Sequence, residues 1–317
     1  MPQKVLITGG NGNLGRLVAA RFIGAGSGVI SFDLPGTMPA QGVLGNYAGD
    51  IRDTAPLARI LDEHAPDAVI HLASLLSGSS EADPHAAWEI NATASINLMH
   101  MMHERGIGPF VFASTVATYA STFPRHLPED APQWPENVYG ATKVAVERMG
   151  VWLKTARGFD FRCLRFPMVL SPFAPPGAVT AYPGHAVNAA ARAEPFAFPV
   201  AAETGMSTLF LDDVTHSLFE ITRADRAALT RHAYNLHGFH FTAAALAARI
   251  KAEWPEARLS FEPDAHVDAL ISGWPDKMED ATAREDWGWR PAYDFEACVA
   301  EVIKLARDKD YSISPKI

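Results

Sequence analysis

A tyrosine and a lysine four residues apart carry the most specific chemistry in this sequence. On a helix, Tyr139 and Lys143 would lie one turn apart on the same face. A free tyrosine titrates at about 10, but a nearby ammonium stabilises the phenolate, and lowering that pKa to about 7 needs about 4 kcal/mol. Tyr139 could then take the proton of a substrate hydroxyl while Thr115 holds the same oxygen, help that is typically worth about 10²–10⁴-fold. Since such pairs are also common on helix surfaces, their meaning depends on the surrounding sequence.

A glycine-rich turn near the N-terminus provides that context. Gly9, Gly12 and Gly15 follow the apolar residues 5–7 and precede a helical pattern that starts at Leu14. A strand, a glycine loop and a helix in this order are what a dinucleotide-binding motif requires. The glycines would permit a tight turn, close approach to a pyrophosphate and close helix packing, and the helix N-terminus would attract the phosphates. We expect cofactor contacts at Gly9, Asn11, Gly12, Asn13, Leu14 and Gly15.

The next predicted strand, residues 28–33, ends in an acid. Asp33 lies 18 residues after Gly15, and no Arg or Lys occurs from 34 to 46. An Asp there suits the 2′-hydroxyl of a ribose and would repel a 2′-phosphate. The sequence therefore favours NAD over NADP, although an Asp that is merely solvated at a strand end is the alternative.

The spacing of apolar residues indicates the elements that position these groups. From residue 4 to about 166, strand-like and helix-like patterns alternate, which predicts a doubly wound parallel α/β sheet of the Rossmann type. Ligands bind beyond the carboxyl ends of such strands, where the motifs fall. After residue 166 the chain becomes rich in proline and glycine over 171–184, and short helical and strand patterns follow. We expect an NAD-binding domain over 1–166. Residues 167–317 would mainly form a smaller α/β substrate-binding lobe, with some segments returning to the first domain.

Composition narrows the classes of function. Net charge is −9 without a basic run, which argues against nucleic acid. No apolar stretch could span a membrane, and no secretory signal precedes the first strand. Two cysteines permit no disulfide framework, which suits the cytoplasm, and the histidines lack the spacing of a metal site. We therefore expect a cytoplasmic protein that acts on a small molecule, without metal, nucleic acid or membrane.

The combined pieces resemble the extended short-chain dehydrogenase/reductase family, within the NAD-dependent epimerase/dehydratase superfamily. The matching segments are the glycine loop, Asp33, Asp50-Ile51, His71-Leu72-Ala73, Asn91, Ser114-Thr115, Tyr139-x-x-x-Lys143 and Arg165-Phe166-Pro167. The resemblance implies that Thr115, Tyr139 and Lys143 are catalytic, with a Thr in place of the commoner Ser. It also implies cofactor contacts at Asp50 and Ile51 beside the adenine, and at Leu72, Ala73, Ser74, Asn91, Tyr139, Lys143 and Phe166.

Nearly the whole chain also resembles one subgroup, the short-chain type of L-threonine 3-dehydrogenase. The likeness lies in 74–88, 176–182 and the tryptophan-rich 274–289. It implies substrate contacts at Ser77, Thr115, Tyr139, Thr180 and Tyr182. Helices expected at 86–104 and 138–157 could form the dimer interface that is common in the family.

One difference from the subgroup leaves the identity of the substrate undecided. Ala181 stands where the subgroup usually has an Asp that could pair with a substrate ammonium. We expect NAD-dependent oxidation of a secondary alcohol in a small L-threonine-like hydroxy acid, giving a ketone. The alternatives are a sugar acid or another hydroxy acid without the amino group, a sugar-nucleotide epimerase or dehydratase that releases no NADH, and a non-catalytic cofactor sensor.

The strand predicted at 161–166 contains two further residues, Arg165 and Cys163, for which we expect structural roles. Arg165 could meet a phosphate or a carboxylate or tie the two parts of the chain together, and we favour the tie. Cys163 alternates with apolar neighbours and is expected in the core.

Overall fold

A seven-stranded parallel sheet is the largest element of the computed structural model, which describes residues 1–119, 124–173 and 179–307. Its order is β11-β7-β5-β4-β1-β2-β3, and every neighbouring pair is parallel. The strands are β1 (Lys4–Thr8), β2 (Gly28–Asp33), β3 (Gly45–Ala48), β4 (Ala68–His71), β5 (Phe110–Thr115), β7 (Phe161–Phe166) and β11 (Ala233–Asn235). The predicted doubly wound fold is confirmed.

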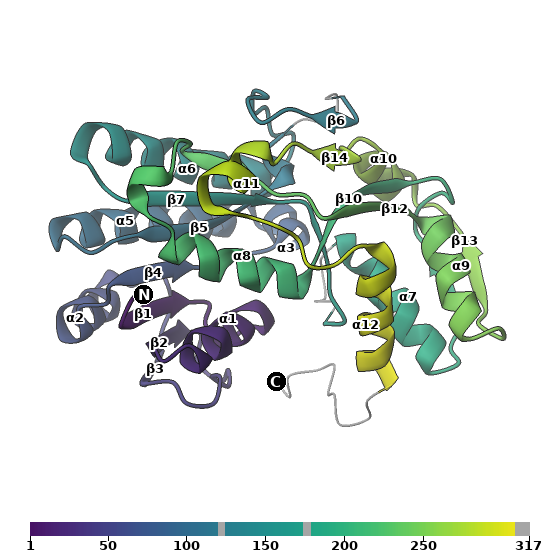
Figure 1. Ribbon diagram of the computed structural model, residues 1–317, viewed down its shortest axis with the longest axis horizontal. Coiled ribbons are helices and arrows are strands. Elements are labelled where there is room, and N and C mark those ends of the chain that lie inside the picture. The colour runs from purple at the N-terminus through teal and green to yellow at the C-terminus, as the bar shows by residue number, and fades with distance from the viewer. Residues whose placement is uncertain (120–123, 174–178, 308–317) are drawn as a thin grey trace.

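Helices cover both faces of this sheet because its strands are apolar on both sides (Figure 1). In β1, Leu6 packs toward one helical layer, whereas Val5 and Ile7 pack toward the other. The first layer contains α2 (Thr54–His64), α5 (Ala94–Glu104) and α6 (Val138–Arg157), and the second contains α1 (Asn13–Gly24), α8 (Leu211–Arg223) and α11 (Ala281–Trp287). Shorter helical elements between β4 and α5 are α3 (Ser77–Ala82), α4 (Pro84–Ala87) and the π-helical turn η1 (Trp88–Thr93).

The spacing of apolar residues did not predict two strands of this sheet, β3 and β11. β3 is half polar, and it is recognisable only through its parallel pairing with β2. β11 follows residue 166 by a long stretch, yet it pairs with β7 at the edge of the large sheet. Later segments thus return to the first sheet, while the boundary between domains at residue 166 stays a prediction.

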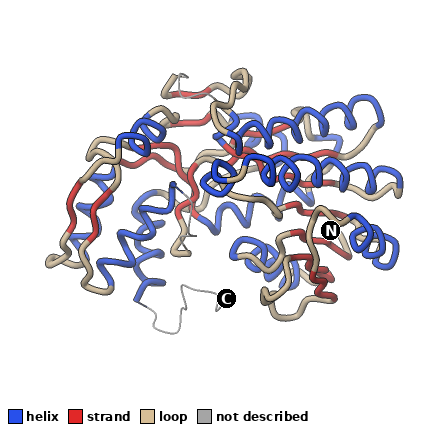
Figure 2. The backbone as a smooth tube through the Cα atoms, turned by 180° about the vertical axis from the view of Figure 1, so that it is seen from behind, coloured by secondary structure: helices blue, strands red, loops and turns tan. Residues whose placement is uncertain are grey.

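A smaller lobe lies at one end of the large sheet, and Figure 2 shows it from behind. Its strands are β8 (Met168–Leu170), β9 (Phe196–Phe198), β10 (Gly205–Phe210), β12 (Phe239–Thr242) and β13 (Leu259–Phe261). Its helices are α7 (Tyr182–Ala191), α9 (Ala243–Glu253), α10 (Ala265–Ser272) and α12 (Phe295–Arg307). A short ladder of β6 (His126–Leu127) with β14 (Lys277–Met278) joins distant segments, and the 3-10 turns are η2 (Val116–Thr118), η3 (Val179–Ala181) and η4 (Arg226–Ala228). None of the helices in the described ranges has both the length and the apolar character needed to cross a membrane.

Candidate active site

The glycine loop forms a tight turn between β1 and α1. Gly9 has φ of +70°, and its N–H donates to Phe32 O at 2.8 Å. A side chain at Gly15 would place its Cβ 2.2 Å from Gly9 O, so the helix can approach the turn only through a glycine. Gly12 is the N-cap of α1 and supplies no side-chain cap. The first-turn N–H groups therefore form the kind of cradle that holds a pyrophosphate, and the residues present fit a dinucleotide.

Residues after β4 border the same loop. A Cβ on Gly9 would lie 2.8 Å from Ala73 N and 2.9 Å from the carbonyl carbon of Leu72. The Ser74 hydroxyl donates to Leu75 O at 3.0 Å. Of the residues predicted to line the cofactor cleft, Leu72 and Ala73 thus directly adjoin the glycine turn.

The carboxyl end of β2 holds the predicted ribose acid. Asp33 Oδ2 accepts the Asn11 N–H at 2.8 Å, and Ser31 Oγ donates to Asn11 Oδ1 at 2.5 Å. Asn11 therefore connects the glycine loop to β2, and the contact of the neighbouring Asp33 carboxylate with a ribose hydroxyl stays a prediction. The Arg52 guanidinium bonds Asp50 at 2.6 Å and holds the pKa of that carboxyl below its ordinary value, while Ile51 is buried.

The segments that carry Thr115 and Tyr139 touch at Ala117 and Gly140. Thr115 ends β5, and its Oγ1 accepts the Ala117 N–H at 3.2 Å. A Cβ on Gly140 would lie 2.0 Å from Ala117 O, so the first turn of α6 rests directly on η2 because residue 140 is glycine. Asn137 caps this helix by accepting the Gly140 N–H at 2.7 Å. Phe166 is the ladder partner of Thr115, which puts it at the same edge of the sheet.

Lys143 is buried beneath Tyr139. Its Nζ donates to Ala113 O at 3.1 Å and lies 4.7 Å from the ring centre of Phe112. Burial raises the pKa of Tyr139 to about 12 and lowers the pKa of Lys143 to about 8. Both shifts arise because the surroundings disfavour the charged form of each group. Lys143 therefore needs compensating interactions to stay charged, and Tyr139 needs additional positive charge to ionise.

Asn91 holds the loop that follows β4. It lies in η1, and its Oδ1 accepts the Leu75 N–H at 2.7 Å while its Nδ2 donates to Leu75 O at 3.1 Å. Isolated π-helical turns often occur at functional sites. Asn91 thus orients the segment that leads to Ser77, the first residue of α3, and its direct contact with the cofactor stays a prediction.

A buried histidine, His71, links this turn to β1. Its Nδ1 lies 2.6 Å from Thr8 Oγ1 and its Nε2 lies 2.7 Å from Ser95 Oγ. Ser95 Oγ donates to Asn91 O at 2.7 Å, so the only consistent arrangement has Nε2–H donating to Ser95 and Nδ1 accepting from Thr8. Burial lowers the pKa of His71 to about 3, with Lys143 a smaller cause, and the ring stays neutral.

Of the two predicted substrate residues in the smaller lobe, Tyr182 is buried and Thr180 is half-buried. Tyr182 is 3% exposed and packs edge-on against Phe198 in the core of the lobe, with ring centres 6.1 Å apart. Thr180 lies in η3 just before it, and Ala181 is buried. The neighbouring residues 174–178 of the proline-rich segment lie outside the described residues. Packing is the observed role of the Tyr182 ring, and its substrate contact stays a prediction.

A buried ion pair that the sequence reasoning did not identify, Arg165 with Glu147, adjoins Ser114 at the end of β5. Arg165 was expected to tie the two parts of the chain together, and that expectation was wrong. Its Nη2 donates to Glu147 Oε2 at 2.6 Å and its Nη1 to the Tyr119 hydroxyl at 2.8 Å, both within the first 166 residues. Spacing could have identified Glu147, because it follows Lys143 by four residues and therefore lies on the same face of α6. Cys163 lies in the core as predicted.

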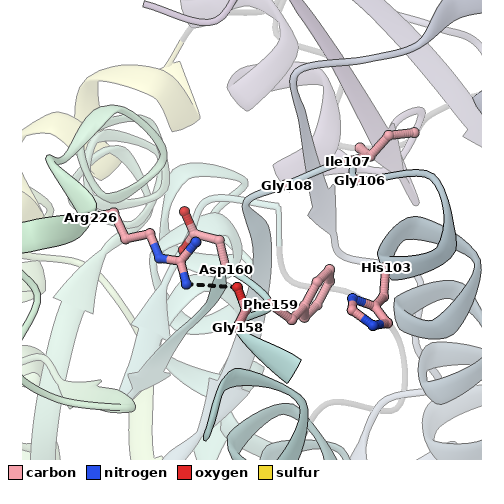
Figure 3. A pocket seen from close by; sticks show the side chains of 8 residues that line it. All are labelled: His103, Gly106, Ile107, Gly108, Gly158, Phe159, Asp160 and Arg226. Atoms are coloured by element: carbon pink, nitrogen blue, oxygen red, sulfur yellow. Dashed lines mark hydrogen bonds between the residues drawn. The ribbon is translucent and has the colours of Figure 1, made fainter. Parts of the chain in front are cut away.

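Two cavities lie away from the predicted site residues. One of about 190 Å³ is at the amino ends of β5 and β7, where Arg226 Nη2 donates to Gly158 O at 2.7 Å, near His103 and Asp160 (Figure 3). Another of about 400 Å³ is on the outer face of α6, beside Trp152. Ligands of doubly wound sheets bind at the opposite edge from the first cavity.

Comparisons with known proteins extend over both parts of the chain. The sequence model of the NAD dependent epimerase/dehydratase family matches residues 5–236. The mitochondrial L-threonine 3-dehydrogenase of Sus scrofa is 31% identical over 309 residues, which cover 95% of this chain and 82% of that protein.

Solved structures show the same relation. The holo form of a GalE-like L-threonine dehydrogenase from Cupriavidus necator matches with a TM-score of 0.89 at 30% identity, covering 95% of this chain and 99% of that one. An L-threonine dehydrogenase from Clostridium difficile matches with a TM-score of 0.91 at 25% identity, covering 98% and 99%. The similarity thus includes most of the residues beyond 236.

Proposed function

The chain belongs to the NAD dependent epimerase/dehydratase family, and on that premise we propose that it oxidises a small hydroxy acid of the L-threonine type to the ketone. Membership confirms the predicted resemblance to the extended short-chain dehydrogenase/reductases, and the protein is an NAD-dependent oxidoreductase. The observation that carries the proposal is the pair of half-buried Tyr139 and buried Lys143, which lies against the end of β5 at the edge of the sheet that holds the glycine loop.

In this proposal Thr115 and Tyr139 act on the substrate hydroxyl, and Lys143 acts on Tyr139. NAD, when bound, supplies the acceptor for the hydride. Thr115 hydrogen-bonds the substrate oxygen, Tyr139 takes its proton, and Lys143 stabilises the phenolate that Tyr139 must become. From a pKa of about 12, reaching about 7 requires about 7 kcal/mol. One unit charge at about 4 Å supplies about 4 kcal/mol at the effective dielectric of a protein surface. Lys143 alone is therefore insufficient, and the positive charge of the oxidised nicotinamide is needed as well.

The residues around Asp33 support NAD rather than NADP. The carboxylate lies at the end of β2, where a ribose hydroxyl would be held, and an extra phosphate there would meet like charge. The proposed cofactor contacts are those predicted from the sequence, with Leu72 and Ala73 supported by their contact with the glycine turn.

The choice of substrate follows from the relatives and from one substitution. The relatives carry the name L-threonine dehydrogenase and span nearly this whole chain, which favours a hydroxy acid of that size. Ala181 offers no carboxylate to a substrate ammonium. A hydroxy acid without the amino group is therefore the second candidate.

Reduction of NAD by the purified protein tests the proposal. The panel contains L-threonine, 3-hydroxybutyrate, short-chain aldonates and uronates, and NADH absorbance is the readout. NADH formed with L-threonine supports the first candidate. NADH formed only with an acid that lacks the amino group supports the second. Turnover of a sugar nucleotide without net NADH would point instead to an epimerase or dehydratase and overturn both.

We also propose that the enzyme is a cytoplasmic homodimer. The two buried free cysteines suit a reducing compartment. Trp88 in η1 and Trp152 on α6 are 47% and 46% exposed, and the apolar cavity beside Trp152 lies on the helical face predicted to pair with a second copy.

A further inference from the structure

We propose that Glu147 is a positioning residue: acting through Ser114, its carboxylate holds Thr115 in the orientation that the reaction with Tyr139 requires. The expected effect on catalysis rests on the proposed function. The contacts of Glu147 and Ser114 do not depend on which substrate is bound. Glu147 and Ser114 do not belong to the catalytic set that the sequence predicted.

The Glu147 carboxylate is buried and receives donors from two strands and the loop before α6. It is 1% exposed. Ser114 Oγ donates to its Oε1 at 2.5 Å, Gln133 Nε2 donates to its Oε2 at 3.0 Å, and Arg165 approaches with both Nε and Nη2. A carboxylate buried in this way has little freedom, because moving it would leave several polar groups unpaired.

Two bonds from successive turns of α6 fix successive residues of β5. Lys143 Nζ donates to Ala113 O at 3.1 Å, and one turn later Glu147 accepts from Ser114. Together they prevent the strand end from sliding or rotating relative to the helix that carries Tyr139. Since successive strand side chains point to opposite faces, a fixed Ser114 hydroxyl also sets the direction in which the Thr115 side chain leaves the chain.

The same network holds the segment on the other side of Thr115. Arg165 is the ladder partner of Ser114 on β7, so Glu147 binds two neighbouring residues of adjacent strands. Arg165 Nη1 donates to the hydroxyl of Tyr119, the residue after η2, at 2.8 Å. Residues 114–119 are thus held at both ends, by the bond of Ser114 to Glu147 and the bond of Tyr119 to Arg165, and Thr115 lies between these two bonds.

Stability alone does not account for this arrangement. Buried ion pairs contribute little net stability, because desolvation offsets their attraction, but they demand one geometry. An ion pair of similar burial, Asp160 with Arg162 at 2.7 Å, lies at the opposite end of β7 and contacts none of the predicted site residues. That pair serves as the matched control.

Ser114→Ala tests the proposal with the smallest change. We expect kcat to fall on the order of 10²-fold, the effect of a displacement of about 1 Å at a reacting group, with KM and NAD affinity nearly unchanged. Ser114→Thr, which keeps a hydroxyl for Glu147, should restore most of the rate. Glu147→Gln should lower kcat at least as much as Ser114→Ala. The control Asp160→Asn should lower Tm without changing kcat.

Hydrogen exchange over residues 113–119 in the NAD complex gives a readout that needs no substrate. It should accelerate in Ser114→Ala and stay at the wild-type rate in Asp160→Asn. If the wild type oxidises nothing in the panel, the proposed function fails, and this exchange still decides the positioning. The inference is overturned if Ser114→Ala keeps both the wild-type kcat and the wild-type exchange rate. It is also overturned if Ser114→Thr does not restore the rate. Both tests hold even where Glu147→Gln does not fold.

Discussion

The Nζ atom of Lys143 lies 5.4 Å from the ring centre of Tyr139, one helical turn away on α6. Burial disfavours charge on both groups, which raises the pKa of Tyr139 to about 12 and lowers the pKa of Lys143 to about 8. The pair is therefore not a strong base by itself. In the proposed mechanism it becomes one when further positive charge lies beside it, so that proton removal would depend on the presence of the oxidised cofactor.

Replacing Tyr139 with Phe should abolish proton removal. We expect NAD reduction to fall by at least about 10²-fold, because general-base assistance is lost, with NAD affinity within about 3-fold of the wild type. Steady-state kinetics and a fluorescence titration with NAD measure the two effects. Tyr47→Phe, at the exposed edge strand β3, is the control and should keep full activity. Full turnover by Tyr139→Phe would exclude the mechanism.

Lys143→Met should stabilise the protein without NAD while it removes activity. The pKa of Lys143 is about 8 folded and 10.5 in its ordinary state, so burying the charge destabilises the fold by about 3 kcal/mol at pH values below 8. Losing the bond to Ala113 O costs about 1 kcal/mol, which leaves a gain of about 2 kcal/mol at pH 7.

Because the unfolded chain binds the extra proton between about 8 and 10.5, this gain should fade as pH rises through that range. Urea unfolding at pH 7 and pH 10 measures it. A variant less stable than the wild type at pH 7 would show that Lys143 is not desolvated as described.

His71→Gln should weaken the dependence of stability on acid pH. The pKa of His71 is about 3 folded against an ordinary 6.5, so its neutral form favours folding above 6.5, and up to about 5 kcal/mol is lost as pH falls toward 3. The variant loses hydrogen bonds but cannot titrate, and its free energy of unfolding should change less between pH 7 and pH 4. The exposed His85, changed to Gln, should keep the wild-type slope. Equal slopes in all three proteins would contradict the buried neutral ring.

Asp33→Ser should shift cofactor preference. The loss of a charged acceptor for a ribose hydroxyl weakens NAD binding by about 1.5–3 kcal/mol, or roughly 10- to 150-fold, and removes the repulsion of a 2′-phosphate. Calorimetric titration with NAD and NADP gives both affinities. Asp62→Asn, an exposed acid paired with Arg105 on the outer helices, should bind as the wild type does. An unchanged ratio of NAD to NADP affinity would remove Asp33 from the ribose site.

Trp152→Glu should disrupt a dimer that forms through α5 and α6. The tryptophan is 46% exposed on α6 beside His100 of α5, and a buried charge there would oppose association. Light scattering at micromolar concentration should give a dimeric mass for the wild type and a monomeric mass for the variant. Trp134→Glu, which alters a more exposed tryptophan outside these helices, should remain dimeric. A monomeric wild type would reject the interface.

Much of the first sheet could be predicted from sequence because its signals are local. The alternating patterns predicted the parallel sheet, and apolar residues 5–7 and 28–33 marked β1 and β2 on either side of the glycine loop and α1. The weakly apolar β3 and the distant β11 were not recognised as strands of this sheet, because each depends on a neighbouring strand rather than on its own composition.

By itself the sequence determined which groups could do chemistry and their order along the chain. Tyr139 and Lys143 meet through the period of a helix, and Gly9 adopts its turn because it lacks a Cβ. Only the tertiary structure decided the partners of Arg165, since the choice among distant carboxylates depends on which strand and helix pack together. It also placed the Tyr182 ring in a core, because burial is a property of all surrounding elements at once.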